Sequence, residues 1–115
     1  IEITTNRKEF INAIKLVGIF SGKSNEIRIK IKDNKKVLEL TSADQSIGEN
    51  NYILAAKIDG KPREVIFNWR YINDVLNVLD SEEIFLGINN NDEPAGIKSP
   101  GDNSYIYVLK PIAQT

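Results

Sequence analysis

The chain of 115 residues carries 15 basic and 16 acidic side chains, so its formal net charge of −1 gives no bulk positive field that would indicate a nucleic-acid partner. The absence of cysteine and histidine excludes disulfides and thiolate or imidazole metal sites, and it removes the commonest general base. No apolar run approaches the roughly 20 residues that cross a bilayer and no signal-peptide pattern is present, which predicts one soluble, cytoplasmic domain over residues 1–115.

The first half of the chain predicts one helix and several strands. Between Asn6 and Phe20 the apolar residues recur at helical spacing, and Asn6 and Glu9 stand where a capping box places them. Beyond this helix, isoleucines alternate strictly with basic residues, which predicts a strand with one buried face, and a turn sequence leads into its hairpin partner. The expected elements are a helix at 7–20 and strands at 27–32, around 38–40, and at 52–58.

In the second half, Asn68 separates a short apolar strand from a second helix. Asn68 stands where a side-chain cap is expected, and the residues after it have an apolar face of helical period. The expected elements are a strand at 64–67, a helix at 69–79, and strands at 84–88, 95–98 and 104–110. Each half then reads as a strand, a helix and three strands. This order predicts an α+β fold, an internally duplicated unit with antiparallel sheets and two helices on one side.

Carboxylates gather in two places without the surroundings that catalysis requires. One cluster is Asp80 with Glu82 and Glu83, and the other is Asp92 with Glu93. Both lie in polar, turn-like sequence, where a solvated surface is expected, because acid–base catalysis needs environments that separate two pKa values. No glycine-rich phosphate loop is present. We therefore predict no catalytic residues, no metal site, no cofactor and no enzymatic activity.

The basic strand at residues 27–36 supports an alternative hypothesis. Its lysines and arginine alternate with isoleucine, and a basic strand face binds phosphate electrostatically. Modules that bind single strands usually add exposed aromatic residues on the same face, and none is interleaved here. A charged, solvated face that protects a sheet from aggregation explains the same pattern. A stand-alone nucleic-acid-binding or interaction module is therefore the alternative function.

Two stretches carry a resemblance to a known family: VIFNWRYINDVL at 65–76 and SYIYVLKPI at 104–112. With them, nearly the whole chain resembles the third, C-terminal domain of the beta subunit of the bacterial DNA polymerase III sliding clamp. The resemblance implies an accessory subunit that closes as a homodimeric ring around duplex DNA, tethers the replicative polymerase and is associated with the nucleoid. A whole subunit has three such domains, and the lack of a starting methionine favours a processed chain or an excised fragment.

The resemblance also implies three sets of site residues. In the family, a pocket binds short linear motifs of polymerases, clamp-loader subunits and repair proteins, an apolar contact closes the ring, and helices line its central hole. The matching positions are Asn68, Tyr71, Pro94, Val108, Lys110, Pro111 and Ile112 for the pocket, Ile19 and Phe20 for the dimer interface, and Arg7, Lys8, Lys15 and Arg70 for the DNA-facing surface. The family commonly has methionine at the position of Lys110.

Overall fold

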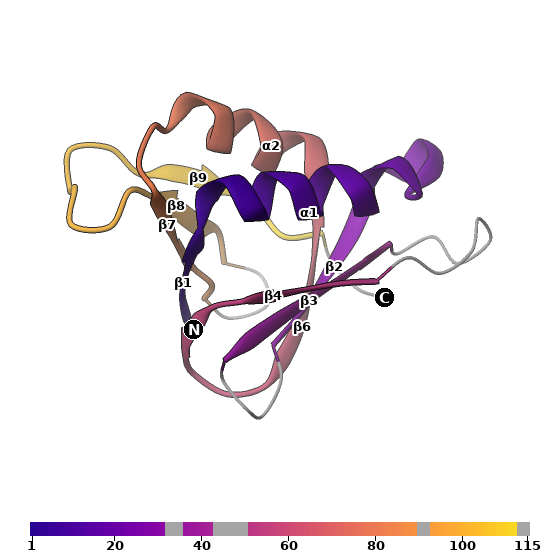
Figure 1. Cartoon of the computed structure of the whole chain (residues 1–115), viewed down its shortest axis with the longest axis horizontal. Helices are drawn as coiled ribbons and strands as arrows, with labels where there is room; N and C mark the ends of the chain where they lie inside the picture. Colours follow the sequence, from indigo (N-terminus) through magenta and orange to yellow (C-terminus); the bar gives the residue numbers. More distant parts are fainter. Residues whose placement is uncertain (32–35, 43–50, 90–92, 113–115) are drawn as a thin grey trace.

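The computed structural model places two helices side by side over two antiparallel sheets (Figure 1). It describes residues 1–31, 36–42, 51–89 and 93–112. The helices are α1 (Arg7–Ile19) and α2 (Trp69–Val78), and a short 3₁₀ helix, η1 (Gly22–Ser24), follows α1. The predicted α+β class, with both helices on one side, is confirmed. Some predicted features lie outside the described residues: Lys32 and Lys35 of the basic stretch, Asp33 and Asn34 of the turn expected after the strand at 27–32, and Asp92 of the second acidic cluster.

Within the described residues, nine strands form the two sheets. The strands are β1 (Glu2–Asn6), β2 (Glu26–Ile31), β3 (Val37–Ser42), β4 (Asn51–Ala55), β5 (Lys57–Asp59), β6 (Arg63–Asn68), β7 (Glu83–Gly87), β8 (Ala95–Lys98) and β9 (Tyr107–Leu109). The five-stranded sheet has the order β5-β1-β7-β8-β9, and the four-stranded sheet has the order β4-β3-β2-β6. Alternate residues of β2 are buried, as its isoleucine pattern predicts.

Each half of the chain gives its first strand to the sheet of the other half. β1 pairs with β7, and β6 pairs with β2. The two pairings have the same register, because Asn6 lies opposite Glu83 at the start of β7 and Asn68 lies opposite Glu26 at the start of β2. The predicted duplication is therefore present, and its two copies are interlocked.

Both helices begin at an asparagine cap, as the sequence predicts. The side-chain oxygen of Asn6 accepts a hydrogen bond from the backbone of Glu9 at 2.9 Å. The side-chain oxygen of Asn68 accepts one from the backbone of Arg70 at 3.0 Å. Each cap satisfies a helical N–H group that has no partner within the helix. The caps therefore fix where each strand ends and its helix begins.

The segment from Tyr52 to Ile58 is two strands, and the prediction of one long strand is wrong. β4 ends at Ala55 in the four-stranded sheet, and β5 begins at Lys57 in the five-stranded sheet. Burial of Leu54 and Ile58 continues the same alternation across this change of sheet, so the pattern alone did not reveal it. The last strand is also shorter than predicted, because the residues at 104–106 are exposed and form no part of β9.

One hydrophobic core fills the space between the sheets and the helices. The inner faces of both helices and the inward-facing residues of both sheets belong to a single cluster of buried side chains. The largest side chains with almost no exposure are Phe10, Phe67, Ile3, Ile14, Ile27, Ile29, Leu38, Leu40, Leu54, Ile72, Leu76 and Ile84. The outer sheet faces and outer helix surfaces remain available for contacts with other molecules.

The two helices approach each other closely at Gly18 of α1. A Cβ atom at this position would lie 2.5 Å from Cδ2 and Cε2 of Trp69, the first residue of α2. The indole ring thus occupies the space that any larger residue at position 18 would need. The guanidinium carbon of Arg70 lies 5.1 Å from the centre of the same indole ring, within the range of a cation–π contact.

We predict that Gly18→Ala destabilises the fold by about 1–3 kcal/mol through overpacking against Trp69. A glycine-to-alanine change in an uncrowded helix stabilises by roughly 0.5–1 kcal/mol, so a loss of stability would identify overpacking at this position. Urea unfolding measures the difference, and Asn12→Ala, at an exposed position of the same helix, is the matched control that should cause no such loss. A penalty of equal size in a Trp69→Leu background would exclude the indole ring as its cause.

Candidate functional site

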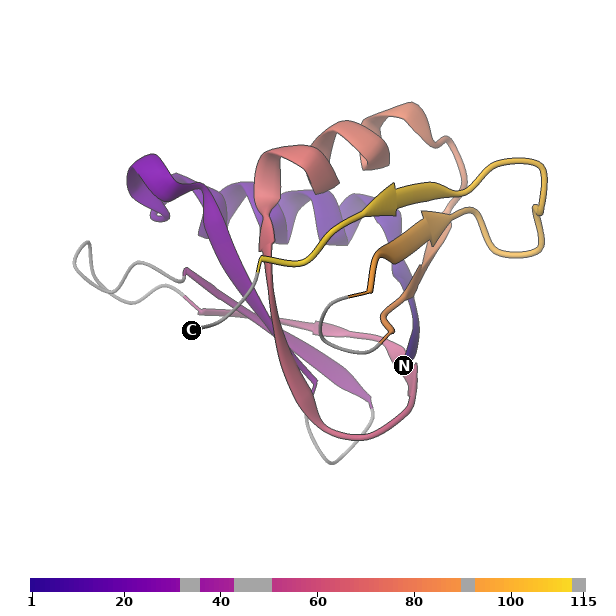
Figure 2. The same ribbon diagram turned by 180° about the vertical axis from the view of Figure 1, so that it is seen from behind.

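The end of the chain ties the two sheets together beside the start of α2. After β9, at the edge of the five-stranded sheet, the chain runs to β6, at the edge of the four-stranded sheet (Figure 2). There the backbone N–H of Ile112 donates a hydrogen bond to the carbonyl of Ile66 at 2.8 Å. Asn68, two residues after Ile66, is the cap of α2. The structure therefore brings the C-terminal residues next to Asn68, although more than 40 positions separate them in the sequence.

We use the name groove for the surface at this junction that is formed by Asn68, Tyr71, Val108, Lys110, Pro111 and Ile112. It presents apolar side chains to solvent. Val108 is 63% exposed because its neighbours on β9 face the core, and Tyr71 of α2 is 62% exposed. Pro111 and Ile112 are half-buried, and Lys110 is exposed beside them. The groove therefore combines aromatic and aliphatic surface with one ammonium group.

Pro94 lies at the same end of the sheet. Ala95 pairs with Leu109 across β8 and β9, so the next residues outward, Pro94 and Lys110, are neighbours on adjoining chain segments. The carbonyl of Pro94 accepts a hydrogen bond from the side chain of Asn89 at 2.9 Å. All seven residues predicted for a peptide pocket thus lie around one junction between the sheets. Their role in binding stays a prediction.

The two residues predicted for a dimer interface lie at the C-terminal end of α1. Ile19 is 70% exposed and Phe20, the helix C-cap, is 40% exposed. The carbonyl of Phe20 accepts a hydrogen bond from the hydroxyl of Ser42 at 2.8 Å, which fixes this corner against β3. Two adjacent, largely exposed apolar residues on a fixed corner suit a protein contact. Their role in assembly stays a prediction.

Three of the four residues predicted to face DNA are exposed on the helices. Lys8 and Lys15 lie on the outer surface of α1, and Arg70 lies on α2. Arg70 also donates a hydrogen bond from Nε to the side chain of Asn25 at 3.2 Å, so its position is restrained. These side chains give the outer helix surface a local positive charge. Their contact with DNA stays a prediction.

Arg7 has structural partners that the sequence did not indicate. Its Nε donates to the carbonyl of Ser81 at 2.7 Å, and its Nη1 donates to the carbonyl of Leu76 at 3.1 Å. The second of these carbonyls belongs to the last turn of α2, where a positive charge is favourable because of the helix dipole. Arg7 therefore joins the start of α1 to the end of α2. Sequence reasoning missed this role because the partners lie about 70 positions away.

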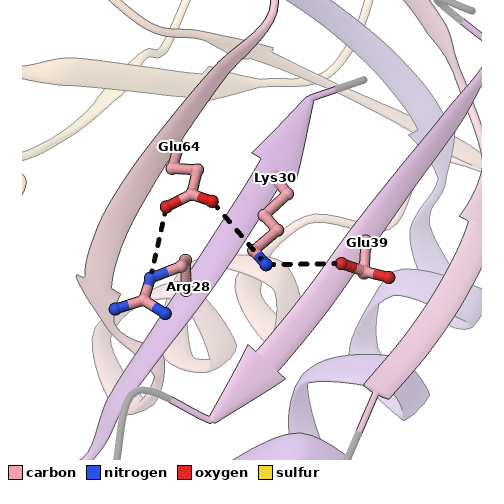
Figure 3. Close-up of polar contacts among 4 residues, drawn as sticks. All are labelled: Arg28, Lys30, Glu39 and Glu64. Atoms are coloured by element: carbon pink, nitrogen blue, oxygen red, sulfur yellow. Dashed lines mark ion pairs between the residues drawn. The ribbon is translucent and has the colours of Figure 1, made fainter. Parts of the chain in front are cut away.

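The basic residues of β2 are neutralised by glutamates on both neighbouring strands (Figure 3). Arg28 Nε lies 3.6 Å from Glu64 Oε2, and Lys30 Nζ lies 3.6 Å from Glu64 Oε1 and 3.7 Å from Glu39 Oε1. Glu39 is on β3 and Glu64 is on β6, so the strand is flanked by acids from both sides. The four charges sum to zero. The described part of this sheet face therefore carries no net positive charge that would attract phosphate.

Asp102, in the segment before β9, is a carboxylate with a structural role. Hydrogen bonds from the backbone and side chain of Ser104 hold the pKa of Asp102 below its usual value, and Lys98 acts in the same direction. Asp102 is exposed, and its bond to the Ser104 backbone, 2.8 Å long, shapes the loop before β9.

In the described ranges, no group of three or more potential metal-binding side chains lies together. No helix among them is long and apolar enough to span a membrane.

Comparison with known proteins gives a consistent result. The family model for the DNA polymerase III beta subunit, C-terminal domain, matches residues 1–113. The beta sliding clamps of Bacillus subtilis and Synechococcus elongatus are 28% and 26% identical over 114 and 111 residues, covering 96% of this chain and 30% of each relative. The solved DNA polymerase III beta subunit of Thermotoga maritima matches with a TM-score of 0.91 and 24% identity, over 99% of this chain and 31% of its own. The chain thus spans about 30% of the curated relatives it matches.

We predict that Arg7→Ala lowers the free energy of unfolding by about 1–3 kcal/mol, because it leaves two carbonyls at the end of α2 without a charged donor. Lys8→Ala is the matched control, since Lys8 is exposed on the same turn, and it should change stability by less than about 0.5 kcal/mol. Urea unfolding followed by circular dichroism measures both variants. Equal stability of the two would contradict the structural role of Arg7.

Proposed function

Because the chain belongs to the family formed by the C-terminal domain of the DNA polymerase III beta subunit, a non-catalytic processivity factor in DNA replication, we propose that it serves as one domain of a ring-shaped sliding clamp. In this proposal the whole protein encircles duplex DNA as a homodimer and tethers the replicative polymerase. The chain contributes one of three such domains to each subunit, in line with its share of about 30% of the length of its relatives.

The observation that carries the proposal is the junction at Ile112 and Ile66. Their hydrogen bond holds the exposed apolar residues of the groove beside the cap of α2, and this arrangement supports the proposal of a site for an extended peptide. We propose that Tyr71, Val108 and Ile112 contact leucine or phenylalanine side chains of a short linear motif. The cap uses only the side-chain oxygen of Asn68, so its amide nitrogen is available to donate to the peptide backbone. Partners of this kind are polymerases, clamp-loader subunits and repair proteins.

The proposed contact with DNA is loose and independent of sequence. The exposed Lys8, Lys15 and Arg70 attract phosphates without reading base edges. A weak attraction suits sliding, because a ring holds DNA by closure and does not need high affinity. The neutral ion-pair network on β2 gives no support to the alternative, a stand-alone nucleic-acid module that uses residues 27–36.

We predict that a peptide with a glutamine followed by spaced leucine and phenylalanine shifts the amide NMR signals of Asn68, Tyr71 and Ile112. Binding to this chain alone is expected to be weak, with Kd in the range of about a millimolar, because one domain supplies only one wall of the pocket. Tyr71→Ala should weaken binding severalfold by removing an aromatic contact. Tyr105→Ala, at an aromatic residue 72% exposed outside the groove, is the control. Unchanged spectra at millimolar peptide would refute the peptide site.

A second prediction concerns ring closure in a chain that carries all three domains. Ile19→Asp should shift the dimer to monomer, because it places a charge in an apolar interface. Val78→Asp on α2 introduces the same charge at a residue of similar exposure, 64% against 70%, and should leave the dimer intact. Sedimentation velocity measures the two populations. An Ile19→Asp protein that remains dimeric would remove this residue from the interface.

A further inference from the structure

The outer face of the five-stranded sheet carries a shallow trough with a glycine floor. The strand register places one residue of each strand in a row across the sheet: Asp59 on β5, Glu2 on β1, Gly87 on β7, Gly96 on β8 and Val108 on β9. A depression of about 500 Å³ covers the first four positions, and Phe85 and Ile106 also line it. The row ends at Val108, which belongs to the groove.

The glycines at both floor positions make room for two side chains of this chain that line the trough. A Cβ atom at Gly96 would lie 2.7 Å from Cδ1 of Ile106, and one at Gly87 would lie 3.3 Å from Cε1 of Phe85. The backbone does not require glycine here, because the glycines with positive φ are at other positions of the described chain. The two glycines therefore let Ile106 and Phe85 lie against the sheet, and these side chains form the apolar part of the trough lining.

The far end of the trough carries two carboxylates that face each other. Glu2 and Asp59 are direct cross-strand partners, an arrangement of like charges that destabilises a sheet. Both are exposed, and in the described part of the chain neither forms an ion pair. Lys98, a cation beside the trough, is already held over the Phe85 ring at 5.6 Å and bonded to Asn103. The N-terminal ammonium of Ile1, which also lines the trough, donates to the carbonyl of Ile88 at 2.9 Å. The acidic end therefore suits a cation that comes from outside.

We propose that the trough binds the basic flank of a partner's peptide, with a lysine or arginine between Glu2 and Asp59 and an apolar side chain against Phe85 and Ile106. This inference extends the peptide binding proposed above and rests on it, since Val108 is common to the trough row and the groove. Four strand spacings of about 4.8 Å separate Val108 from Asp59, a span of about 19 Å. An extended peptide covers this distance in about six residues. The basic residue therefore lies about six positions from the nearest apolar anchor.

The test compares two pairs of peptides that share the glutamine, leucine and phenylalanine anchors. In each pair, one peptide carries lysine six residues from the nearest anchor and the other carries glutamate at the same position. One pair has this residue before the anchors, and the other pair has it after them. In one of the pairs, the lysine peptide should shift the amide signals of Gly87 and Gly96 and bind about three to five times more tightly than its glutamate partner. The difference should shrink as salt is raised.

Variants of the chain separate the trough from general charge effects. Glu2→Gln combined with Asp59→Asn should abolish the preference for lysine. Asp80→Asn combined with Glu82→Gln changes the net charge equally at positions away from the trough and should leave the preference intact. Amide spectra of both double variants confirm that the fold is retained.

The outcomes distinguish failure of the trough from failure of the peptide function. If all peptides shift Asn68 and Tyr71 equally while Gly87 and Gly96 stay unchanged, the trough is overturned and the groove stands. If lysine peptides shift only the two glycines, the groove is overturned, and the proposal that the trough binds the flank of an anchored peptide falls with it. If no signal moves, or if the preference survives in the Glu2 and Asp59 double variant, the trough proposal is wrong.

Discussion

The exchange of first strands between the two halves is the constraint on which the rest of the structure depends. Each exchanged strand leads directly into a helix, and the first helical N–H bonds to a carbonyl of the other half. Arg7 N donates to Glu82 O and Trp69 N donates to Asn25 O, both at 2.9 Å. The start of each helix is therefore fixed to the sheet of the opposite half. This interlock places both helices on the same side and leaves the outer sheet faces free.

The groove arises from a difference between two otherwise equivalent crossings. In the first half, the chain passes from one sheet to the other through β4 and β5, and β5 pairs with β1 at three positions. In the second half, the chain passes in the opposite direction from β9 to β6, and in the described residues a single backbone bond, Ile112 to Ile66, takes the place of a strand. The alternation of β9 turns Val108 outward, so its apolar side chain lies at the surface beside this looser crossing. Among the described residues, the duplicated fold thus has one crossing held by a paired strand and one held by a single backbone hydrogen bond.

Local sequence signals predicted the elements well, and long-range contacts account for what they missed. The caps at Asn6 and Asn68 and the alternation along β2 depend on near neighbours, so they could be read directly. The change of sheet between β4 and β5 leaves the alternation intact and is set by which strand each segment meets. The role of Arg7 depends on carbonyls about 70 positions away. The trough draws one residue from each of five strands, so no segment of the sequence contains its pattern.

The net charge of each surface also depends on which charged residues the fold brings together. The most basic stretch of the sequence carries Arg28 and Lys30, yet glutamates on the two adjacent strands cancel these charges. Lys8 and Lys15, in contrast, are exposed on a helix surface where no acid pairs with them in the described residues. A chain of net charge −1 can therefore present a mildly positive helix surface and a neutral sheet face. In a ring closed as proposed, this asymmetry turns the attractive surface toward the enclosed DNA and keeps the outer sheets from competing for it.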